Sequence, residues 1–428
     1  MKIKNVCALL SLPALLLLSN HAVASLVPVI KVPVPQGSIG PGGPGAPGEG
    51  NMPPSGEQEE PPADGTFSLA ANGITILCKG AKPGDTGIIN GKTFTAYDDD
   101  TLYAIGQENS QEVADVLFSH ACTSNVTDLS WTFYNYGGNP DIAHWDTSSV
   151  TTMYKMFDRA VNFNNPIGAW DVSKVEDMDY MFNFASKFNQ PIGQWNTASV
   201  TMMERMFANA IVFNQPIGSW NTSNVTTMKR MFERAWAFNQ DLDSWNTSLV
   251  NTMEGMFADA TAFNGKVDSW QTGNVVSMRE MFYRANSFNQ PVGGWNVSSV
   301  QDMRLMFAFA SVFNQPIGGW DTASVENMSY MFNQALEFNH PIGNWNIRNV
   351  NSISYMFSSA MAFDQPIGDW NTANITDFSF AFANAAKFNQ DLSGWCTIKA
   401  TNTLNFNSGT LAWTPKEGRE PVWGVCPV

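Results

Sequence analysis

Amides and carboxylates recur every 25 residues in this chain, one position after a tryptophan, and they are the side chains best suited to recognise a ligand. The tryptophan recurs from Trp145 to Trp395, and a β-branched residue, mostly Thr, follows it by two positions. If Trp and Thr point inward, alternation turns the residue between them outward. A row of such groups could hydrogen-bond sugars or a peptide, or the amides could satisfy one another. The candidates are Asp146, Asp171, Asn196, Asn221, Asn246, Gln271, Asn296, Asp321, Asn346 and Asn371.

A second column of interest lies five positions after the valine of each repeat. In a helix this position is about 150° from the core direction, so it is expected to be exposed. The column begins with Lys155, Tyr180, Arg205 and Arg230 and becomes apolar later. Four neighbouring apolar groups predict a patch for a partner or for self-association, unless packing near the C-terminus covers it. These candidates are Leu305, Tyr330, Tyr355 and Phe380.

Catalytic chemistry has little support in the sequence. Cleavage of an N-terminal signal would leave His120, His144 and His340, and none belongs to a Ser-His-Asp or Cys-His arrangement. We therefore expect no enzyme activity, no metal centre and no cofactor. Asp243 and Asp268 replace the glycine of other repeats, which indicates either tolerated turn residues or a weak calcium site.

Composition and charge exclude some classes of partner. The chain has 428 residues, of which 44% are hydrophobic and 14% charged, so it is neither a disordered acidic chain nor a coiled coil. Lys plus Arg number 23 against 38 Asp plus Glu, a formal net charge of −15. Nucleic-acid binding is not expected, because neutralising phosphates requires a basic surface.

The N-terminal region predicts export. Residues 1–24 combine Lys2 and Lys4, an apolar run too short to span a bilayer, and an Ala22-Val23-Ala24 cleavage site. Residues 25–65 are rich in Pro and Gly and predict a disordered linker. No later apolar run approaches the length of a membrane span, so a secreted or cell-surface location is expected.

The 25-residue period predicts a solenoid in which each repeat forms one rung. In one rung, Ile217–Thr222 reads as a short strand, and residues 225–235 carry apolar groups at spacings that favour one face of a helix. A single rung cannot bury enough apolar area to fold alone, so neighbours must stack. The expected class is α/β: a leucine-rich-repeat-like solenoid of about ten strand-turn-helix rungs over residues 122–395.

The repeat also resembles a known family. The string Trp-Asn-Thr-Ser-x-Val-x-x-Met-x-x-Met-Phe-x-x-Ala-x-x-Phe-Asn-Gln is similar to the BspA-type leucine-rich-repeat surface proteins, over about residues 122–395. That resemblance implies a bacterial, secreted or surface-exposed protein, and adhesion as the associated activity.

Caps and disulfides are expected at both ends of the array. Residues 66–121 predict an N-terminal cap, in which 74–77 and 92–95 flank an Asn90-Gly91 hairpin turn and a helical stretch follows at 101–119. Residues 396–428 predict a C-terminal cap. Cys78 with Cys122, and Cys396 with Cys426, bracket the two caps, whereas crossed pairs would have to span the whole array.

The sequence thus favours an exported binding protein that adheres through its solenoid surface to an unknown protein or glycan. The alternative is a structural surface or matrix component that assembles with itself and has no separate ligand.

Overall fold

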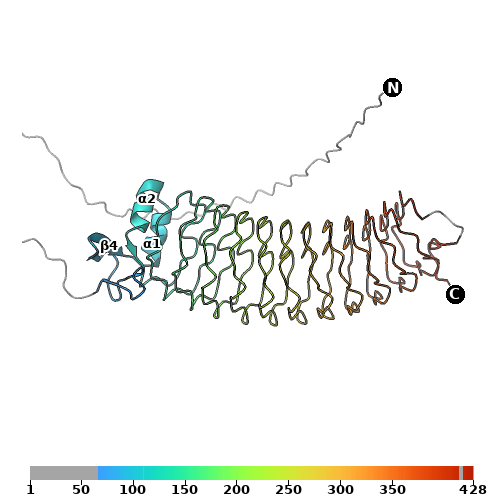
Figure 1. Cartoon of the computed structure of the whole chain (residues 1–428), viewed down its shortest axis with the longest axis horizontal. Helices are drawn as coiled ribbons and strands as arrows, with labels where there is room; N and C mark the ends of the chain where they lie inside the picture. The colour runs from blue at the N-terminus through green and yellow to red at the C-terminus, as the bar shows by residue number, and fades with distance from the viewer. Residues whose placement is uncertain (1–65, 109, 414–417, 428) are drawn as a thin grey trace, which may run out of the picture. The chain divides into compact units, whose positions relative to one another are not determined.

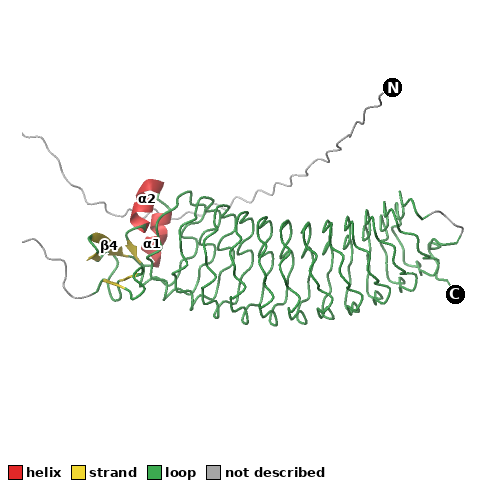
Figure 2. Cartoon of the chain, viewed as in Figure 1, coloured by secondary structure: helices red, strands yellow, loops and turns green. Residues whose placement is uncertain are grey.

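The computed structural model describes residues 66–108, 110–413 and 418–427, which belong to one compact unit (Figure 1). The predicted signal segment, residues 1–24, and the predicted linker, residues 25–65, lie outside the described residues. Among the described residues, every helix and every named strand precedes Thr123, and the repeats consist of loops and turns (Figure 2).

The N-terminal cap contains two antiparallel strand pairs. β1 (Ser68–Leu69) pairs with β2 (Ile76–Leu77), and β3 (Thr86–Ile89) pairs with β4 (Lys92–Ala96). The short β5 (Ala121–Cys122) continues the second sheet, parallel to β4. Asn90 and Gly91 form the turn between β3 and β4 with φ of 53° and 76°, as a two-residue hairpin requires. The predicted turn and the predicted strand at 92–95 are confirmed, but the segment 74–77 is not the other strand of this hairpin, because β2 pairs with β1 and β3 takes that place.

Two short helices replace the single predicted helical stretch at 101–119. α1 (Asp99–Gly106) begins after Asp98, which forms a capping box with Thr101. α2 (Gln111–Phe118) begins after Ser110, whose hydroxyl accepts from the backbone of the third helical residue. The apolar faces of both helices join the buried cluster of the first rung. The helices therefore cover the start of the array.

Beyond the cap, successive repeats stack on one another. Within the described residues, eleven parallel bridges connect equivalent positions from Asp128 to Asn402. All but the first link residues 25 apart, because the first repeat is one residue shorter. The predicted strand at 217–222 and helix at 225–235 do not form, and turns occupy the second segment.

Hydrogen bonds between rungs explain why no helix forms. The backbone N–H groups of Gly255, Phe257 and Asp259 donate to carbonyls of the next rung, at 2.6 to 2.9 Å. The N–H groups between them close turns three residues long, as when Met256 donates to Met253. An α-helix needs every N–H to bond four residues back within the same segment. The apolar spacing of the repeat suits both arrangements, so the sequence alone could not separate them.

This ribbon of turns has an unusual backbone. Two residues per rung, ten and fourteen positions after Trp, have φ near +55° to +65°, as in Arg230 and Arg234. L-residues disfavour that left-handed region by about 1–2 kcal/mol. Only Gly255 and Gly409 are glycines at these positions. The bonds to neighbouring rungs therefore hold conformations that the side chains themselves oppose.

Aromatic columns fill the interior. Trp220 and Trp245 are buried, with ring centroids 6.4 Å apart and planes 1° apart. The indole N–H of Trp220 donates to the carbonyl of Ile192 in the preceding rung at 3.1 Å. Two phenylalanine columns stack in the same way, as Phe232 does on Phe257 at 5.6 Å. Each rung therefore completes the core of its neighbours.

Both predicted disulfides are confirmed. Cys78 is bonded to Cys122, and Cys396 to Cys426. They close loops of 44 and 30 residues, for which the chain-entropy description gives roughly 4 kcal/mol each. The second loop holds residues 418–427 against the last rungs, where Trp423 packs on Phe406 at 5.1 Å.

Candidate functional site

The column one residue after each Trp, called the amide column here, caps turns of its own rung. The side-chain oxygen of Asn221 accepts from the backbone N–H of Ser223 at 3.1 Å, and Asn246 accepts from Ser248 at 3.0 Å. Among the described residues, these amides do not bond to one another, so they form no ladder of their own. Their NH₂ groups have no protein acceptor within the described part of the chain. The outward orientation expected from the sequence is found at nine of the ten candidates, all but Asp146.

Two members of the column depart from this arrangement. Asp146 is only 3% exposed and accepts from the Ser124 hydroxyl at 2.6 Å, which ties the first rung to the cap. Gln271 folds back, so that its NH₂ group donates to its own rung at Ser269 and its oxygen accepts from Thr247. We call an amide unoccupied when its NH₂ group has no protein acceptor among the described residues. Unoccupied amides lie on three successive rungs, at Asn196, Asn221 and Asn246.

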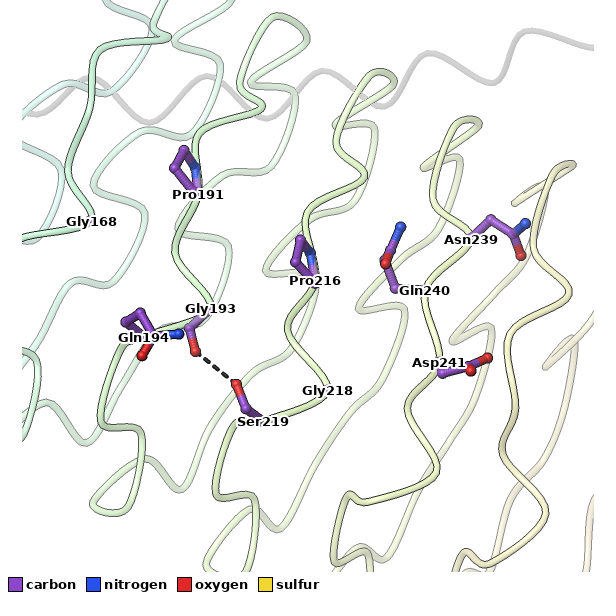
Figure 3. Close-up of a pocket in the computed structure, with 10 residues that line it drawn as sticks. All are labelled: Gly168, Pro191, Gly193, Gln194, Pro216, Gly218, Ser219, Asn239, Gln240 and Asp241. Carbon is purple, nitrogen blue, oxygen red and sulfur yellow. Dashed lines mark hydrogen bonds between the residues drawn. The ribbon is translucent and has the colours of Figure 1, made fainter.

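A groove of about 780 Å³ crosses the same rungs. Figure 3 shows Pro191 and Pro216 on neighbouring rungs, with Gln194 and Ser219 in the row below them. Gln194 and Ser219 directly precede a buried Trp, and the amide column directly follows it. Both positions flank a buried Trp, and the groove and the run of amides belong to the same rungs, although none of Asn196, Asn221 and Asn246 lines the groove.

Glycines make the floor of this groove. A Cβ on Gly193 would lie 2.3 Å from the carbonyl oxygen of Pro216, and one on Gly218 would lie 2.7 Å from that of Asp241. Real Cβ atoms do not approach so closely, so any other residue would push the rungs apart. Asp241 is the groove's only charged lining residue, and its carboxylate accepts from the Lys266 N–H at 2.9 Å.

The second candidate column lies ten residues after Trp and is called the left-handed column here. Leu305, Tyr330, Tyr355 and Phe380 were expected to be exposed, but all four are half-buried. Tyr355 stacks between Tyr330 and Phe380, with centroids 4.5 Å apart on each side. The exposure prediction was wrong because it assumed a helix. The ring faces cover one another and do not form an open platform.

The earlier part of the left-handed column is charged. The Arg230 guanidinium lies 2.7 Å from Glu233, 3.5 Å from Glu254 and 2.7 Å from Glu280. It reaches Glu280, two rungs away, past Gly255, where a Cβ would come within 2.9 Å of the arginine side chain. The sequence did not reveal this ion-pair cluster, because its members are 3 to 50 residues apart.

The carboxyl group of Asp179, two rungs before Arg230, has a strongly shifted pKa. Burial raises the pKa of Asp179 to about 7, and the charges of Asp177 and Glu204 add to the effect. The Glu204 N–H donates to the Asp179 carboxylate at 2.5 Å. Burial, together with Glu204, also raises the pKa of Tyr180 to about 12. Sequence reasoning missed this group, because the 25-residue period places Asp179 beside Glu204 only after stacking.

Asp243 has a partner that accounts for its presence in the turn. Its carboxylate accepts from the Ser269 N–H at 2.8 Å, and this bond lowers its pKa. No cluster of three or more His, Cys, Asp or Glu side chains among the described residues is arranged to hold a metal ion. Likewise, no helix in the described part has the length and apolar character of a membrane span.

Comparison with known proteins gives one family. A family described as "Mycoplasma protein of unknown function, DUF285" matches residues 127–245, 209–319 and 308–413, together more than half of the chain. A search of curated proteins found no match. One solved structure, the plant peptide hormone receptor RGFR1 in complex with RGF2, is 8% identical with a TM-score of 0.14. That match covers 66% of this chain and 65% of the receptor chain, and so low a TM-score supports no structural argument.

Proposed function

Since the chain belongs to the DUF285 family of repeat proteins, whose description gives no function, we propose that it is an exported, non-catalytic binding protein. In this proposal the stacked rungs are a leucine-rich-repeat-like solenoid of the BspA type. The rungs present their outer face to a partner, and the resulting activity is adhesion at a secreted or cell-surface location.

The observation that carries the proposal is the run of exposed amides whose NH₂ groups have no protein acceptor among the described residues. Asn196, Asn221 and Asn246 present these donors on three adjacent rungs, and the same rungs contribute to a groove of about 780 Å³. Unpaired, exposed donors on a rigid scaffold lose little freedom when they bind, which favours recognition. The two disulfides support an oxidising, extracellular compartment.

A structural, self-assembling role is the second candidate. Leu404 is 60% exposed and Leu411 is 83% exposed in the last described rung. Exposed apolar groups at the end of a stack favour association. Light scattering on the chain from residue 25 onward tests this role, since a self-assembling component grows with concentration and a receptor stays monomeric.

The binding proposal is tested by probing the mature chain on arrays of glycans and matrix proteins. The triple variant Asn196→Asp, Asn221→Asp and Asn246→Asp keeps the turn-capping oxygen and removes each NH₂ donor. Matched controls are Asn346→Asp and Asn371→Asp, which lie in the same column on rungs that do not contribute to the groove. The triple variant should lose its signals and the controls should keep them. Absence of any array signal for the wild-type chain would contradict the proposal.

A further inference from the structure

We propose that one edge of the stack binds the surface of an anionic lipid membrane. This edge, called the basic edge here, is the turn fourteen to seventeen positions after Trp in four successive rungs, residues 159–162, 184–187, 209–212 and 234–237. The inference goes beyond the proposed function, because it concerns other side chains and another partner. A chain held in this way lies on the membrane and does not span it.

Exposed apolar side chains gather at this turn. Ten large hydrophobic side chains are exposed between Trp145 and Trp395, and seven of them lie fourteen, sixteen or seventeen positions after Trp, although such positions make up less than a fifth of each repeat. The basic edge holds four of the seven, which are 36–51% exposed: Val161, Phe184, Val212 and Trp236. Scattered apolar groups are ordinary on a protein surface, whereas a row with one on every rung is typical of an interaction site.

Contacts between rungs make the row continuous. The Arg159 guanidinium lies over the Phe184 ring, 4.9 Å from its centroid. The Phe184 N–H donates to the carbonyl of Ala208 at 2.8 Å, and the Ala237 N–H donates to that of Ile211 at 3.2 Å. Because the backbone fixes the four turns, their side chains meet a partner together and lose little freedom in doing so.

The same turn is basic in an acidic protein. From fourteen to twenty positions after Trp, the four rungs contain Arg159, Lys187 and Arg234 and no acidic residue, whereas the whole chain has a net charge of −15. All three cations are exposed. Among the described residues, Arg159 and Lys187 have no ion-pair partner, and Arg234 has only Asp259 of the next rung, at 3.7 Å. Charges more than about 10 Å away are screened at 0.1 M salt, so these cations determine how the edge meets a charged surface.

The combination of apolar and basic groups favours a lipid surface. At a bilayer boundary, apolar side chains enter the acyl region while neighbouring Arg and Lys side chains remain at the anionic headgroups. Trp is enriched at that boundary, and Trp236 is the most exposed apolar residue of the edge. A soluble polyanion would use the cations alone and leave the apolar side chains in water. A protein partner would need a surface shaped to fit four separate turns, whereas a fluid bilayer adapts to them.

Later rungs supply a matched control. Val312, Leu336 and Met361 form a second apolar row at the same turn and are 39–41% exposed. Glu337 accompanies this row, and Lys and Arg are absent from the turn in these three rungs. The second row should therefore not bind an anionic surface.

Vesicle flotation tests the proposal. The chain from residue 25 onward is mixed with vesicles of phosphatidylcholine alone, or of phosphatidylcholine with one third phosphatidylglycerol, and the bound fraction is measured. Vesicles with phosphatidylglycerol should bind at least about 10-fold more strongly at 0.1 M salt, and the preference should shrink at 0.5 M salt. Equal binding to both kinds of vesicle would contradict the role of the cations.

Substitutions locate the contact at this edge. Trp236→Ser should weaken binding to the anionic vesicles about 5-fold, and Lys187→Gln and Arg234→Gln should weaken it about 5-fold each. Met361→Ser, at the same position of the repeat as Trp236, should change the affinity by less than about 2-fold. Thermal unfolding of each variant verifies that the stack is intact.

Three other results would overturn the proposal. The first is the absence of binding to the anionic vesicles, or an equal loss of binding in Trp236→Ser and Met361→Ser. The second is a dimer that forms without vesicles and dissociates in Trp236→Ser, which would make the edge an interface between copies of this chain. The third is a protein signal on the array that Trp236→Ser removes, without vesicle binding, which would make the partner a protein. The amide variants test other side chains, so the proposed function stands or fails separately.

Discussion

The left-handed column is built in two different ways along one molecule. Between Lys155 and Glu280 its side chains form ion pairs and cation–π contacts, whereas from Leu305 to Phe380 they are apolar and the rings stack. The backbone is the same in both halves, with positive φ at every one of these residues. The hydrogen bonds between rungs therefore set the conformation, and the side chains of this column are free to vary. The difference shows that the buried core and the hydrogen bonds between rungs define the fold. The side chains of the outer columns differ from rung to rung without changing it.

The largest expected loss of stability should be the same in the charged half and in the aromatic half of the molecule. Phe232→Ala in the charged half and Phe357→Ala in the aromatic half each remove a fully buried ring. Each should lower the free energy of unfolding by about 3–5 kcal/mol. Chemical denaturation of both variants measures this, and a difference above about 2 kcal/mol between them would show that the halves have different cores.

Arg230→Met should be the next most damaging change. It removes the one cation that Glu233, Glu254 and Glu280 share. These side chains are mostly buried, and within the described part of the chain each keeps only one other ion pair, with Arg205, Lys229 and Arg279 respectively. We expect a loss of about 2 kcal/mol at low salt, between values for exposed and buried pairs, and a smaller loss at 1 M salt. The matched control is Arg304→Met, because the more exposed Arg304 has Asp302, in its own rung, as its one ion-pair partner among the described residues. An equal loss in both variants would disprove the role of the cluster.

Tyr355→Leu tests the aromatic half with the opposite salt behaviour. The change keeps an apolar side chain but removes two ring stacks, which should cost about 1 kcal/mol. Stacking is insensitive to ionic strength, so the loss should be the same at low and high salt. Denaturant unfolding at two salt concentrations measures it. A salt-dependent loss would mean that the two halves are stabilised by the same kind of interaction.

The smallest effect concerns pH in the charged half. Asp179 has a folded-state pKa raised to about 7, above the value of about 4 in an unfolded chain. The folded protein binds the extra proton between these values, so stability falls as pH rises from about 4 to about 7. Asp179→Asn should flatten this decline by under ~1 kcal/mol, since the carboxyl is only partly buried. Unfolding curves at pH 4, 5.5, 7 and 8 measure it. A variant whose profile still falls as steeply as that of the wild type would rule out Asp179 as the source.

The sequence predicts features that depend on the period alone. The buried Trp and Phe columns, the two disulfides and the outward amide column follow from a 25-residue repeat with capped ends. The ribbon of turns could not be predicted, because the spacing of Val225, Met228, Met231 and Phe232 places these residues on one face of either a helix or a turn ribbon. The outcome depends on hydrogen bonds to residues 24 positions later.

Parts of the candidate site had no local signal. The groove could not be predicted, because it depends on the close approach of Gly193 to the carbonyl of Pro216. That contact exists only once two rungs have stacked. The fold-back of Gln271, which ends the run of unoccupied amides, depends on one extra methylene relative to asparagine. Arg230 reaches Glu280 because Gly255 interrupts the column between them. Each case is a relation between rungs, and a single repeat does not contain it.

The backbone hydrogen bonds between rungs give the stack a net dipole along its axis. In the rung of Gly255, four peptide groups donate toward the next rung and one, at Asn251, donates toward the preceding rung. Peptide dipoles aligned in this way add along the axis, as they do in an α-helix. The stack therefore carries partial negative charge at its first rung, beside the N-terminal cap, and partial positive charge at its last rung. Anions should gather at that last rung, and its field should weaken as the salt concentration increases.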